Sequence, residues 1–374
     1  MAEFSRRAFV LSGLAASQLG AQTQAPKKPA VYPSEAKKYA DPTTELDVYR
    51  LSSPEHSTIL PAYYNRAITH NNASMLLACD RGGELHAYRF DLKNGESHQL
   101  TEVQDLDPLS LTFTPDSRSF CFFAGRQLFI STLNTKPRPL YQIPDGWERC
   151  PGLSIGLDGT HATFAEKQGA GSRIRMVTLV QGIARTVVEM PFEVSHPVPR
   201  PNRAQVLFRQ GDDALWLVNS DGTQKHVLKT AAGKPGPAAW TVDGKSLLYL
   251  SYPTDPKILI QIRDHVPDTN NDTLVAKTSQ YGHFCFNAPA TVFAGACRSL
   301  ASPTMLIMLR HTQREVTMCE HKASRTDMIN PRFSPDTQRM YFQSDRDGKP
   351  AVYSVRLEKW LDKTGEDVDS GGNG

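Results

Sequence analysis

Four basic side chains in this 374-residue sequence are candidates for anion binding or proton transfer: His196, Arg200, His283 and Arg325. An arginine can bind a carboxylate through two parallel hydrogen bonds, and a histidine can move a proton or ligate a metal ion. His196 and Arg200 lie in the run His-Pro-Val-Pro-Arg-Pro, before an apolar segment. The sequence also permits structural roles. Arg200 would then brace a loop, and His283, beside Phe284, would be a buried histidine with satisfied hydrogen bonds.

The six cysteines and one serine motif are poor candidates for catalysis or for a metal site. No two cysteines form a C-x-x-C pair, and no cysteine and histidine have the spacing of a zinc site. Most cysteines lie in apolar runs typical of strands, so we expect buried free thiols. The run Gly152-Leu-Ser154-Ile-Gly156 has the letters of a nucleophile elbow, but it leads into an Asp-Gly turn instead of a helix.

A repeated pattern of turns and strands indicates how the candidate side chains are positioned. An aromatic or apolar residue, a polar turn and an apolar strand recur seven times, and the turns centre on residues 71, 116, 158, 202, 243, 289 and 336. The spacing between turns is therefore 41 to 47 residues. Asp-Gly, Pro-Asp and Asn-Asn pairs favour tight turns between two strands. One small antiparallel sheet cannot bury both of its faces, so the units must stack on one another.

Units of this length, arranged around an axis, predict an all-β fold: a seven-bladed β-propeller with four-stranded antiparallel blades over residues 41–361. Six or eight blades remain possible because the sixth unit is degraded. The alternating segment 46–51 is expected to complete the last sheet and close the ring. Helical repeats are excluded, because turns are too frequent and no long run has a period of 3.6 residues. Residues 362–374 are predicted to be a disordered tail.

The N-terminal residues predict where the protein is sent. Residues 1–21 contain Ser-Arg-Arg-Ala-Phe-Val before a short, mildly apolar run, an order that resembles a twin-arginine (Tat) export signal. Residues 22–40 are predicted to be a flexible leader, and we expect a periplasmic or secreted protein. No run of 18 apolar residues exists, which argues against a membrane span. The 42 basic and 39 acidic residues form no basic stripe, which argues against nucleic acid as the partner.

Three segments of the chain resemble motifs of the oligogalacturonate lyases, polysaccharide lyase family 22. The run from His196 to Pro201 matches the family's H-P-x-x-R-P, and residues 215–222 match its M-W-L-V-N-x-D-G. The run from Gly282 to Asn287 is similar to its S-H-L-M-S-N. The resemblance covers roughly residues 45–357. It implies a seven-bladed propeller that cleaves short oligogalacturonides by β-elimination, using a histidine base, an arginine and a divalent metal ion, typically manganese.

Most of the family's chemical positions carry other residues here. Ala214 stands where the resemblance places the catalytic arginine, and Pro237 where it places the catalytic histidine. Of the family's four metal ligands, only one has a counterpart, His283. The other three positions hold Arg325, Met328 and Asn330. The resemblance therefore assigns His283 a weak metal-ligand role and lets Arg325 supply positive charge in place of the metal ion, and the cofactor stays unassigned.

Two hypotheses about function follow from the sequence. In the first, the protein is a periplasmic member of the lyase family that binds acidic oligosaccharides, such as pectin fragments, through His196, Arg200, His283 and Arg325, with little β-elimination. In the second, it is a non-catalytic scaffold for a periplasmic protein, because residues 333–353 are similar to TolB-type, WD40-like propeller repeats. Arginines and aromatic residues gathered on the loops of one face would favour the first hypothesis.

Overall fold

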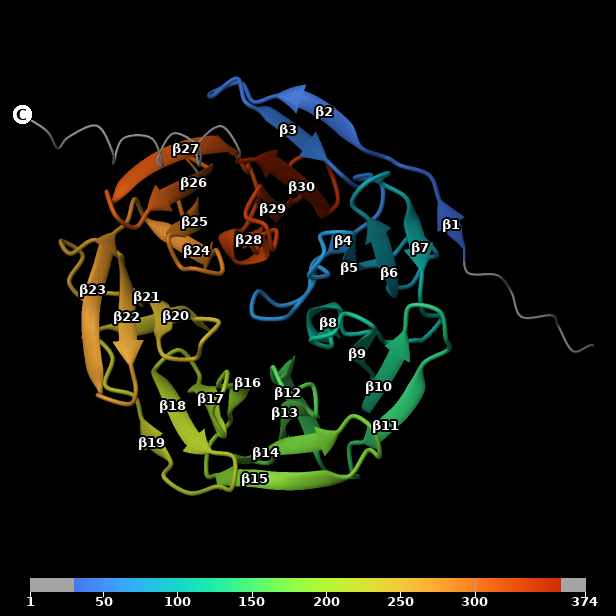
Figure 1. Cartoon of the computed structure of the whole chain (residues 1–374), viewed down its shortest axis with the longest axis vertical. Helices are drawn as coiled ribbons and strands as arrows, with labels where there is room; N and C mark the ends of the chain where they lie inside the picture. The colour runs from blue at the N-terminus through green and yellow to red at the C-terminus, as the bar shows by residue number, and fades with distance from the viewer. Residues whose placement is uncertain (1–29, 300, 358–374) are drawn as a thin grey trace, which may run out of the picture.

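Seven antiparallel sheets are arranged radially around a central axis in the computed structural model of this chain (Figure 1). The structure describes residues 30–299 and 301–357. Each sheet has four strands and two sheets carry a fifth, so the predicted seven-bladed propeller is confirmed. The predicted signal (1–21) and tail (362–374) lie outside the described residues. Within the described ranges, no helix is long and apolar enough to cross a membrane.

The blades follow one another along the chain, and the strands of each blade are given from the axis outward. Blade 1 contains β4 (Thr58–Ile59), β5 (Ser74–Cys79), β6 (His86–Asp91) and β7 (Ser97–Gln99). Blade 2 contains β8 (Thr112–Phe113), β9 (Ser119–Ala124), β10 (Gln127–Thr132) and β11 (Arg138–Gln142). Blade 3 contains β12 (Glu148–Ile155), β13 (His161–Gln168), β14 (Gly171–Thr178) and β15 (Ala184–Met190). Blade 4 contains β16 (Ser195–Pro199), β17 (Gln205–Gln210), β18 (Ala214–Asn219) and β19 (His226–Val227).

The remaining three blades complete the ring. Blade 5 contains β20 (Lys234–Trp240), β21 (Leu247–Tyr252), β22 (Gln261–Val266) and β23 (Asn271–Lys277). Blade 6 contains β24 (Tyr281–Phe286), β25 (Val292–Cys297), β26 (Thr304–Leu309) and β27 (Arg314–Glu320). Blade 7 contains β28 (Arg332–Phe333), β29 (Arg339–Ser344), β30 (Ala351–Arg356) and β3 (Asp47–Arg50). Two short 3-10 helices are also described, η1 (Pro108–Ser110) and η2 (Thr326–Met328).

The same tight turn joins the first and second strands of every blade. In all seven, a backbone N–H donates to the carbonyl three residues earlier, as from Gly244 to Thr241 (2.9 Å). The Asp243 carboxylate also accepts a hydrogen bond from the Thr241 hydroxyl (2.7 Å). The degraded sixth unit forms the turn as well, since the Ala290 N–H donates to the Asn287 carbonyl (2.8 Å). The seven turns lie where the sequence predicts them.

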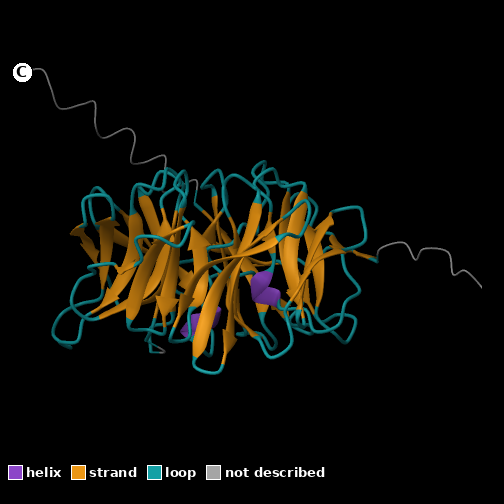
Figure 2. Ribbon diagram, turned by 90° about the horizontal axis from the view of Figure 1, so that it is seen from below, coloured by secondary structure: helices purple, strands orange, loops and turns teal. Residues whose placement is uncertain are grey.

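These turns give the disc two different faces. Figure 2 shows the disc edge-on, with the strands running between the faces. We call the face that carries the seven turns the turn face, and the opposite face, where the innermost strands begin, the start face. Residues at the two ends of one innermost strand therefore lie on opposite faces.

Residues from the start of the chain close the ring. Val48 and Tyr49 of β3 pair with Val355 and Ser354 of β30, so the sequence-predicted closing segment does complete the last sheet. β2 (Lys37–Ala40) adds a strand outside β3, and β1 (Val31–Tyr32) pairs with β7 of blade 1. The range 22–40, for which the sequence predicts a flexible leader, therefore includes these two short strands. These segments form strands because the outer edges of blades 1 and 7 offer unpaired backbone groups.

Apolar side chains pack mainly between neighbouring blades. Phe123 of blade 2 and Phe164 of blade 3, for example, are both fully buried, with ring centroids 5.0 Å apart. The six cysteines are free, and five of them are buried. Cys121 lies in the same cluster as Phe123 and is fully buried, which fits the expectation that the thiols act as small hydrophobic groups.

The innermost strand of blade 1 is interrupted by a bulge, residues 60–67. Ile59 pairs with Ala78, and the ladder resumes only at Ile68, opposite Met75. The residues between them leave the sheet, and Figure 1 shows this segment as a blue loop that reaches into the centre of the ring. We call residues 60–67 the channel bulge. The sequence did not predict it.

Candidate functional site

A pocket of about 770 Å³ lies on the start face, close to the axis. Blades 4, 5 and 6, the segment before blade 7 and the channel bulge all contribute to it. The lining residues are Tyr63, His196, Arg209, Asp212, Lys234, Pro235, Gly236, Pro237, Tyr252, Gly282, Arg298, Thr326 and Asp327. We call this cavity the start-face pocket. It brings together side chains that are far apart in the sequence.

Arg298 is the cation best placed to meet an anionic ligand in this pocket. Its side chain is exposed, and its guanidinium carbon lies 5.3 Å from the centre of the Tyr252 ring. Among the described residues, no carboxylate lies within ion-pair distance of it. Arg209 is more constrained, because it donates hydrogen bonds to the carbonyls of Pro235 and Gly236 (2.8 Å to Gly236). An arginine and an aromatic ring therefore face the pocket side by side.

The two predicted histidines both lie near this pocket and are uncharged at neutral pH. Burial lowers the pKa of His196 to about 4, with Arg209 contributing. Burial likewise lowers the pKa of His283 to about 4. In each ring, Nδ1 is buried and has no hydrogen-bond partner in the part of the chain that the structure describes. His196 lines the pocket, whereas the buried His283 lies behind Gly282, which lines it.

Two tyrosines of the channel bulge, Tyr63 and Tyr64, stand between these two histidines. His196 meets the edge of Tyr64 (5.8 Å between ring centres), Tyr64 meets Tyr63 (5.1 Å), and Tyr63 meets His283 (5.1 Å). All three contacts are close to perpendicular, the arrangement in which the positive edge of one ring meets the negative face of the next. The histidines are consequently held apart, on two sides of a tyrosine pair, and they do not share a site.

Hydrogen bonds hold the bulge to other parts of the ring, including blade 5 and blade 7. The Tyr63 hydroxyl accepts a hydrogen bond from the N–H of Ala238 in blade 5 (2.9 Å) and donates one to the carbonyl of the same residue (3.1 Å). From blade 7, the Arg332 guanidinium donates to the Pro61 carbonyl (2.7 Å), and Asn330 also donates to it. Asn330 stands at a position that the family resemblance assigns to a metal ligand, and here it holds backbone instead.

Arg200 is not part of the start-face pocket. It follows β16 at its far end, on the turn face, and only 2% of it is exposed. Its guanidinium donates to the Gly244 carbonyl (2.7 Å) and to the Asp268 carboxylate (2.7 Å), and it lies over the Trp240 ring at 5.2 Å. These contacts fix the junction of blades 4 and 5. The structure therefore gives Arg200 the bracing role that the sequence left open, and it does not bring Arg200 together with His196.

Arg325 lies beside the start-face pocket but does not line it. It precedes η2, its side chain is 72% exposed, and it pairs with Asp327, whose carboxylate does line the pocket. This pair holds the pKa of Asp327 below its ordinary value. The charge of Arg325 is thus offset locally, which leaves Arg298 as the freer cation.

The residues around His283 do not fit a manganese ion. Manganese prefers several oxygen or imidazole ligands. Among the described residues, no three His, Cys, Asp or Glu side chains gather closely enough to hold a metal ion. The neighbour that His283 contacts is the Tyr63 ring, and the Arg332 guanidinium contributes to lowering its pKa. The nearby Arg332 cation opposes binding of a further positive charge, and Asp327 acts on His283 in the opposite direction but supplies a single carboxylate.

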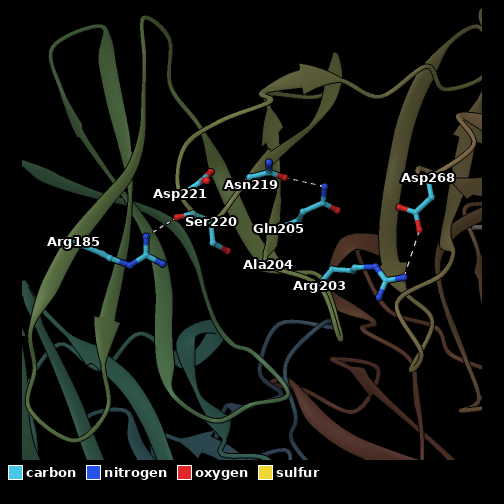
Figure 3. Close-up of a pocket in the computed structure, with 8 residues that line it drawn as sticks. All are labelled: Arg185, Arg203, Ala204, Gln205, Asn219, Ser220, Asp221 and Asp268. Carbon is cyan, nitrogen blue, oxygen red and sulfur yellow. Dashed lines mark hydrogen bonds and ion pairs between the residues drawn. The ribbon is translucent and has the colours of Figure 1, made fainter.

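A further hollow, of about 610 Å³, lies at the turns of blades 3, 4 and 5 (Figure 3). Its charged groups are satisfied within the protein. Arg185 donates to the Ser220 carbonyl, and Arg203 lies 3.9 Å from Asp268. Gln205 donates to the Asn219 side chain (3.1 Å). Because these groups are partnered, this hollow is a weaker candidate for an anion site than the start-face pocket.

Sequence reasoning missed Tyr63, Arg209 and Arg298. No local motif marks these residues, since each comes from a different blade and they meet only when the ring closes. The Tyr63-Tyr64 pair could have been noticed as two adjacent aromatic residues outside the repeat pattern. Pro237 does line the pocket, at the position where the resemblance places a histidine.

Comparisons with known proteins agree with this architecture. No family model matches the chain. The oligogalacturonide lyase of Pectobacterium atrosepticum is 23% identical over 370 residues, and the oligogalacturonate lyase of Dickeya dadantii is 24% identical over 372 residues. Each alignment covers 85% of this chain and 95% of the relative. A solved structure of an oligogalacturonate lyase in complex with manganese superposes with a TM-score of 0.83 and 22% identity, over 88% of this chain and 98% of that one. The chain is thus a seven-bladed β-propeller that resembles the oligogalacturonate lyases in sequence and in fold along most of its length.

Proposed function

We propose that this protein binds short acidic oligosaccharides in the start-face pocket and performs little or no β-elimination on them. The supporting observation is the pairing of Arg298 with Tyr252 in that pocket, in a chain similar along most of its length to lyases of oligogalacturonides. A guanidinium can bind a uronate carboxylate bidentately. An aromatic ring beside it offers a flat apolar surface to a sugar ring. A volume of about 770 Å³ lies in the range of ordinary ligand pockets.

Weak catalysis follows from the side chains near the pocket. Removing the proton next to a carboxylate requires a base whose pKa lies near the working pH. His196 and His283 have a pKa of about 4, which makes them poor bases. Ala214 and Pro237, at the positions that the resemblance assigns to the arginine and the histidine, can neither offset charge nor carry a proton. The loss of one acid–base group alone costs about 10²- to 10⁴-fold in rate.

Binding is tested by calorimetry with unsaturated digalacturonate. We expect a saturable interaction that weakens about tenfold or more in Arg298→Gln, because a charge-assisted hydrogen bond is lost. Arg203→Gln, which removes an exposed arginine from the turn face, is the matched control and should bind like the unmodified protein. If no acidic oligosaccharide binds, the proposal is wrong, and the scaffold hypothesis takes its place.

Catalysis is tested separately, by incubating the same substrate with the protein and Mn²⁺ and following the products. We expect no turnover above that of a heat-denatured sample. Turnover that EDTA abolishes would contradict the proposed loss of activity, while leaving the binding site in place.

We also propose export through the twin-arginine route, on the basis of the Arg6-Arg7 pair. The test is a fusion of residues 1–40 to a reporter that is active only outside the cytoplasm. Replacing both arginines by lysine should abolish the signal, and export that survives this change would refute the route.

A further inference from the structure

A second, smaller chamber lies on the turn-face side of the channel bulge. Its volume is about 230 Å³, and Tyr63 lines both this chamber and the start-face pocket. The side chains that matter here are Asn65 and Arg66 of the bulge, and Arg332 of blade 7. We call this cavity the turn-face chamber. Because the Tyr63 ring is shared by both cavities, a molecule bound in one is separated from the other by the bulge.

The turn-face chamber carries positive charge, and no carboxylate of the described residues forms an ion pair with it. Arg66 and Arg332 both line it, and its lining contains no Asp or Glu. Neither guanidinium lies within ion-pair distance of an acid in the described residues. The acid that acts on Arg66 from a distance is Asp158 in blade 3. A buried charge without a partner is costly, so an anion in this chamber would be favourable.

The cost of burying an unpaired charge is larger for Arg332 than for Arg66. Only 7% of Arg332 is exposed, and burial lowers its pKa to about 10. The pKa of Arg66 is also lowered by burial, although its side chain is only half-buried. Both guanidinium groups are drawn partly or wholly out of water into one chamber, and carbonyl oxygens of the protein satisfy them only in part.

Donor groups of both arginines remain available to a ligand. Arg66 makes one hydrogen bond, from Nη1 to the Ile155 carbonyl (3.1 Å), and its other guanidinium nitrogens have no partner among the described residues. In Arg332, Nη2 is engaged by the bulge carbonyls of Pro61 (2.7 Å) and Ala62, whereas Nη1 makes only one long bond, 3.5 Å, to the Asn65 carbonyl. The chamber therefore offers N–H groups from two elements and opens at the turn face.

We propose that the turn-face chamber binds a small oxyanion, a phosphate or a short carboxylate, between Arg66 and Arg332. A planar guanidinium matches the oxygens of either group with two N–H donors. The volume of about 230 Å³ admits such an ion but not an oligosaccharide. This site is distinct from the start-face pocket and does not depend on the function proposed for that pocket. By fixing Arg66 of the bulge to Arg332 of blade 7, the anion would also hold the bulge in place.

The experiment is a titration with inorganic phosphate, and in parallel with acetate, at constant ionic strength, followed by calorimetry and by ³¹P line broadening. We expect the unmodified full-length protein to bind one phosphate or acetate, and the tighter of the two defines the ligand class. Arg66→Gln should weaken binding about tenfold or more, because one charge-assisted contact is lost. Arg332→Lys, which keeps the charge but not the planar fork, should weaken it too and guards against misfolding of a neutral variant.

Arg298→Gln, on the start face, is the matched control and should bind the oxyanion normally. The proposal is overturned if the unmodified protein shows no saturable binding, if Arg66→Gln binds as tightly as the unmodified protein, or if Arg298→Gln loses the site. Digalacturonate titrated into the same variants separates the two sites. Arg66→Gln should bind the sugar normally, so failure of the oxyanion site and failure of the oligosaccharide site give different results.

Discussion

Replacing Tyr63 by phenylalanine removes a single oxygen atom from the channel bulge and tests whether that bulge is tethered across the ring. The hydroxyl accepts from the Ala238 N–H (2.9 Å) and donates to the Ala238 carbonyl (3.1 Å). Ala238 lies on the innermost strand of blade 5, so these backbone groups have no neighbouring strand on the channel side. The ring itself, and its contact with His283, are kept in the variant.

The expected loss of stability can be worked from these contacts. Each neutral hydrogen bond contributes about 1 kcal/mol, and water from the adjoining start-face pocket can partly replace the hydroxyl. We therefore expect Tyr63→Phe to lower the free energy of unfolding by about 1–2 kcal/mol. Tyr63→Ala also removes a large side chain from a packed row of rings, and should cost about 3–5 kcal/mol.

Urea denaturation, followed by fluorescence and by circular dichroism, measures both changes as shifts of the midpoint at an unchanged slope. Tyr39→Phe is the control, because the Tyr39 hydroxyl is buried without a hydrogen-bond partner in the described part of the chain. Losing that hydroxyl should be neutral or slightly stabilising. If Tyr63→Phe and Tyr39→Phe unfold at the same urea concentration, the hydroxyl does not tether the bulge and the reasoning fails.

Three further predictions concern acid, packing and closure. His196 and His283 have a pKa of about 4 in the folded state, against an ordinary value of 6.5. Between these two values the unfolded chain binds more protons than the folded chain. The free energy of unfolding is therefore at its full value above pH 6.5 and falls by up to about 3 kcal/mol for each histidine as the pH drops toward 4. Urea midpoints between pH 7 and 4.5 should show this decline, and a variant with both histidines replaced by asparagine should flatten it. Gly295→Ala should lower the melting temperature, because a Cβ there would stand 2.1 Å from the Tyr281 ring; an unchanged melting curve would show that the ring can move. Val48→Asp places a charge at a fully buried position of the closing strand, and we expect loss of cooperative unfolding in calorimetry, whereas Val31→Asp, at an exposed position of β1, should unfold normally.

The repeat spacing predicts the blades well because every blade depends on the same local chemistry. The turn at Asp243 is closed by groups only two or three residues apart, and such contacts leave a clear trace in the sequence. The sixth turn lacks the aspartate but still forms, since Asn287 provides the equivalent backbone and side-chain hydrogen bonds. The repeat spacing therefore predicts the blades even where one unit has lost the usual turn residues.

The candidate site was harder to predict because its contacts are between residues far apart in the sequence. Tyr63 meets a residue 175 positions later in the chain, and no pattern within the bulge indicates that partner. Arg200 illustrates a second limit. The motif that contains it matches the family, but a motif does not say which end of a strand reaches which face, and Arg200 and His196 lie at opposite ends of β16. The strands β1 (Val-Tyr) and β2 (Lys-Lys-Tyr-Ala) were missed because they are too short to show an alternating pattern. β1 also depends on pairing with β7, more than 60 residues later in the chain.

The closing strand has a consequence for the order in which the protein can be completed. β3 pairs with β30, roughly 300 residues later, so the earliest part of the ring to leave the ribosome waits for the last. Until β28, β29 and β30 have been made, β3 has no partner on the side that faces the axis, and the growing chain exposes an unpaired strand edge. Contacts of such long range slow folding, and a half-made ring exposes sheet edges that can pair with other chains. A chaperone that binds the nascent chain at β3 would thus stay bound longest, and it would be released when β3 pairs with β30.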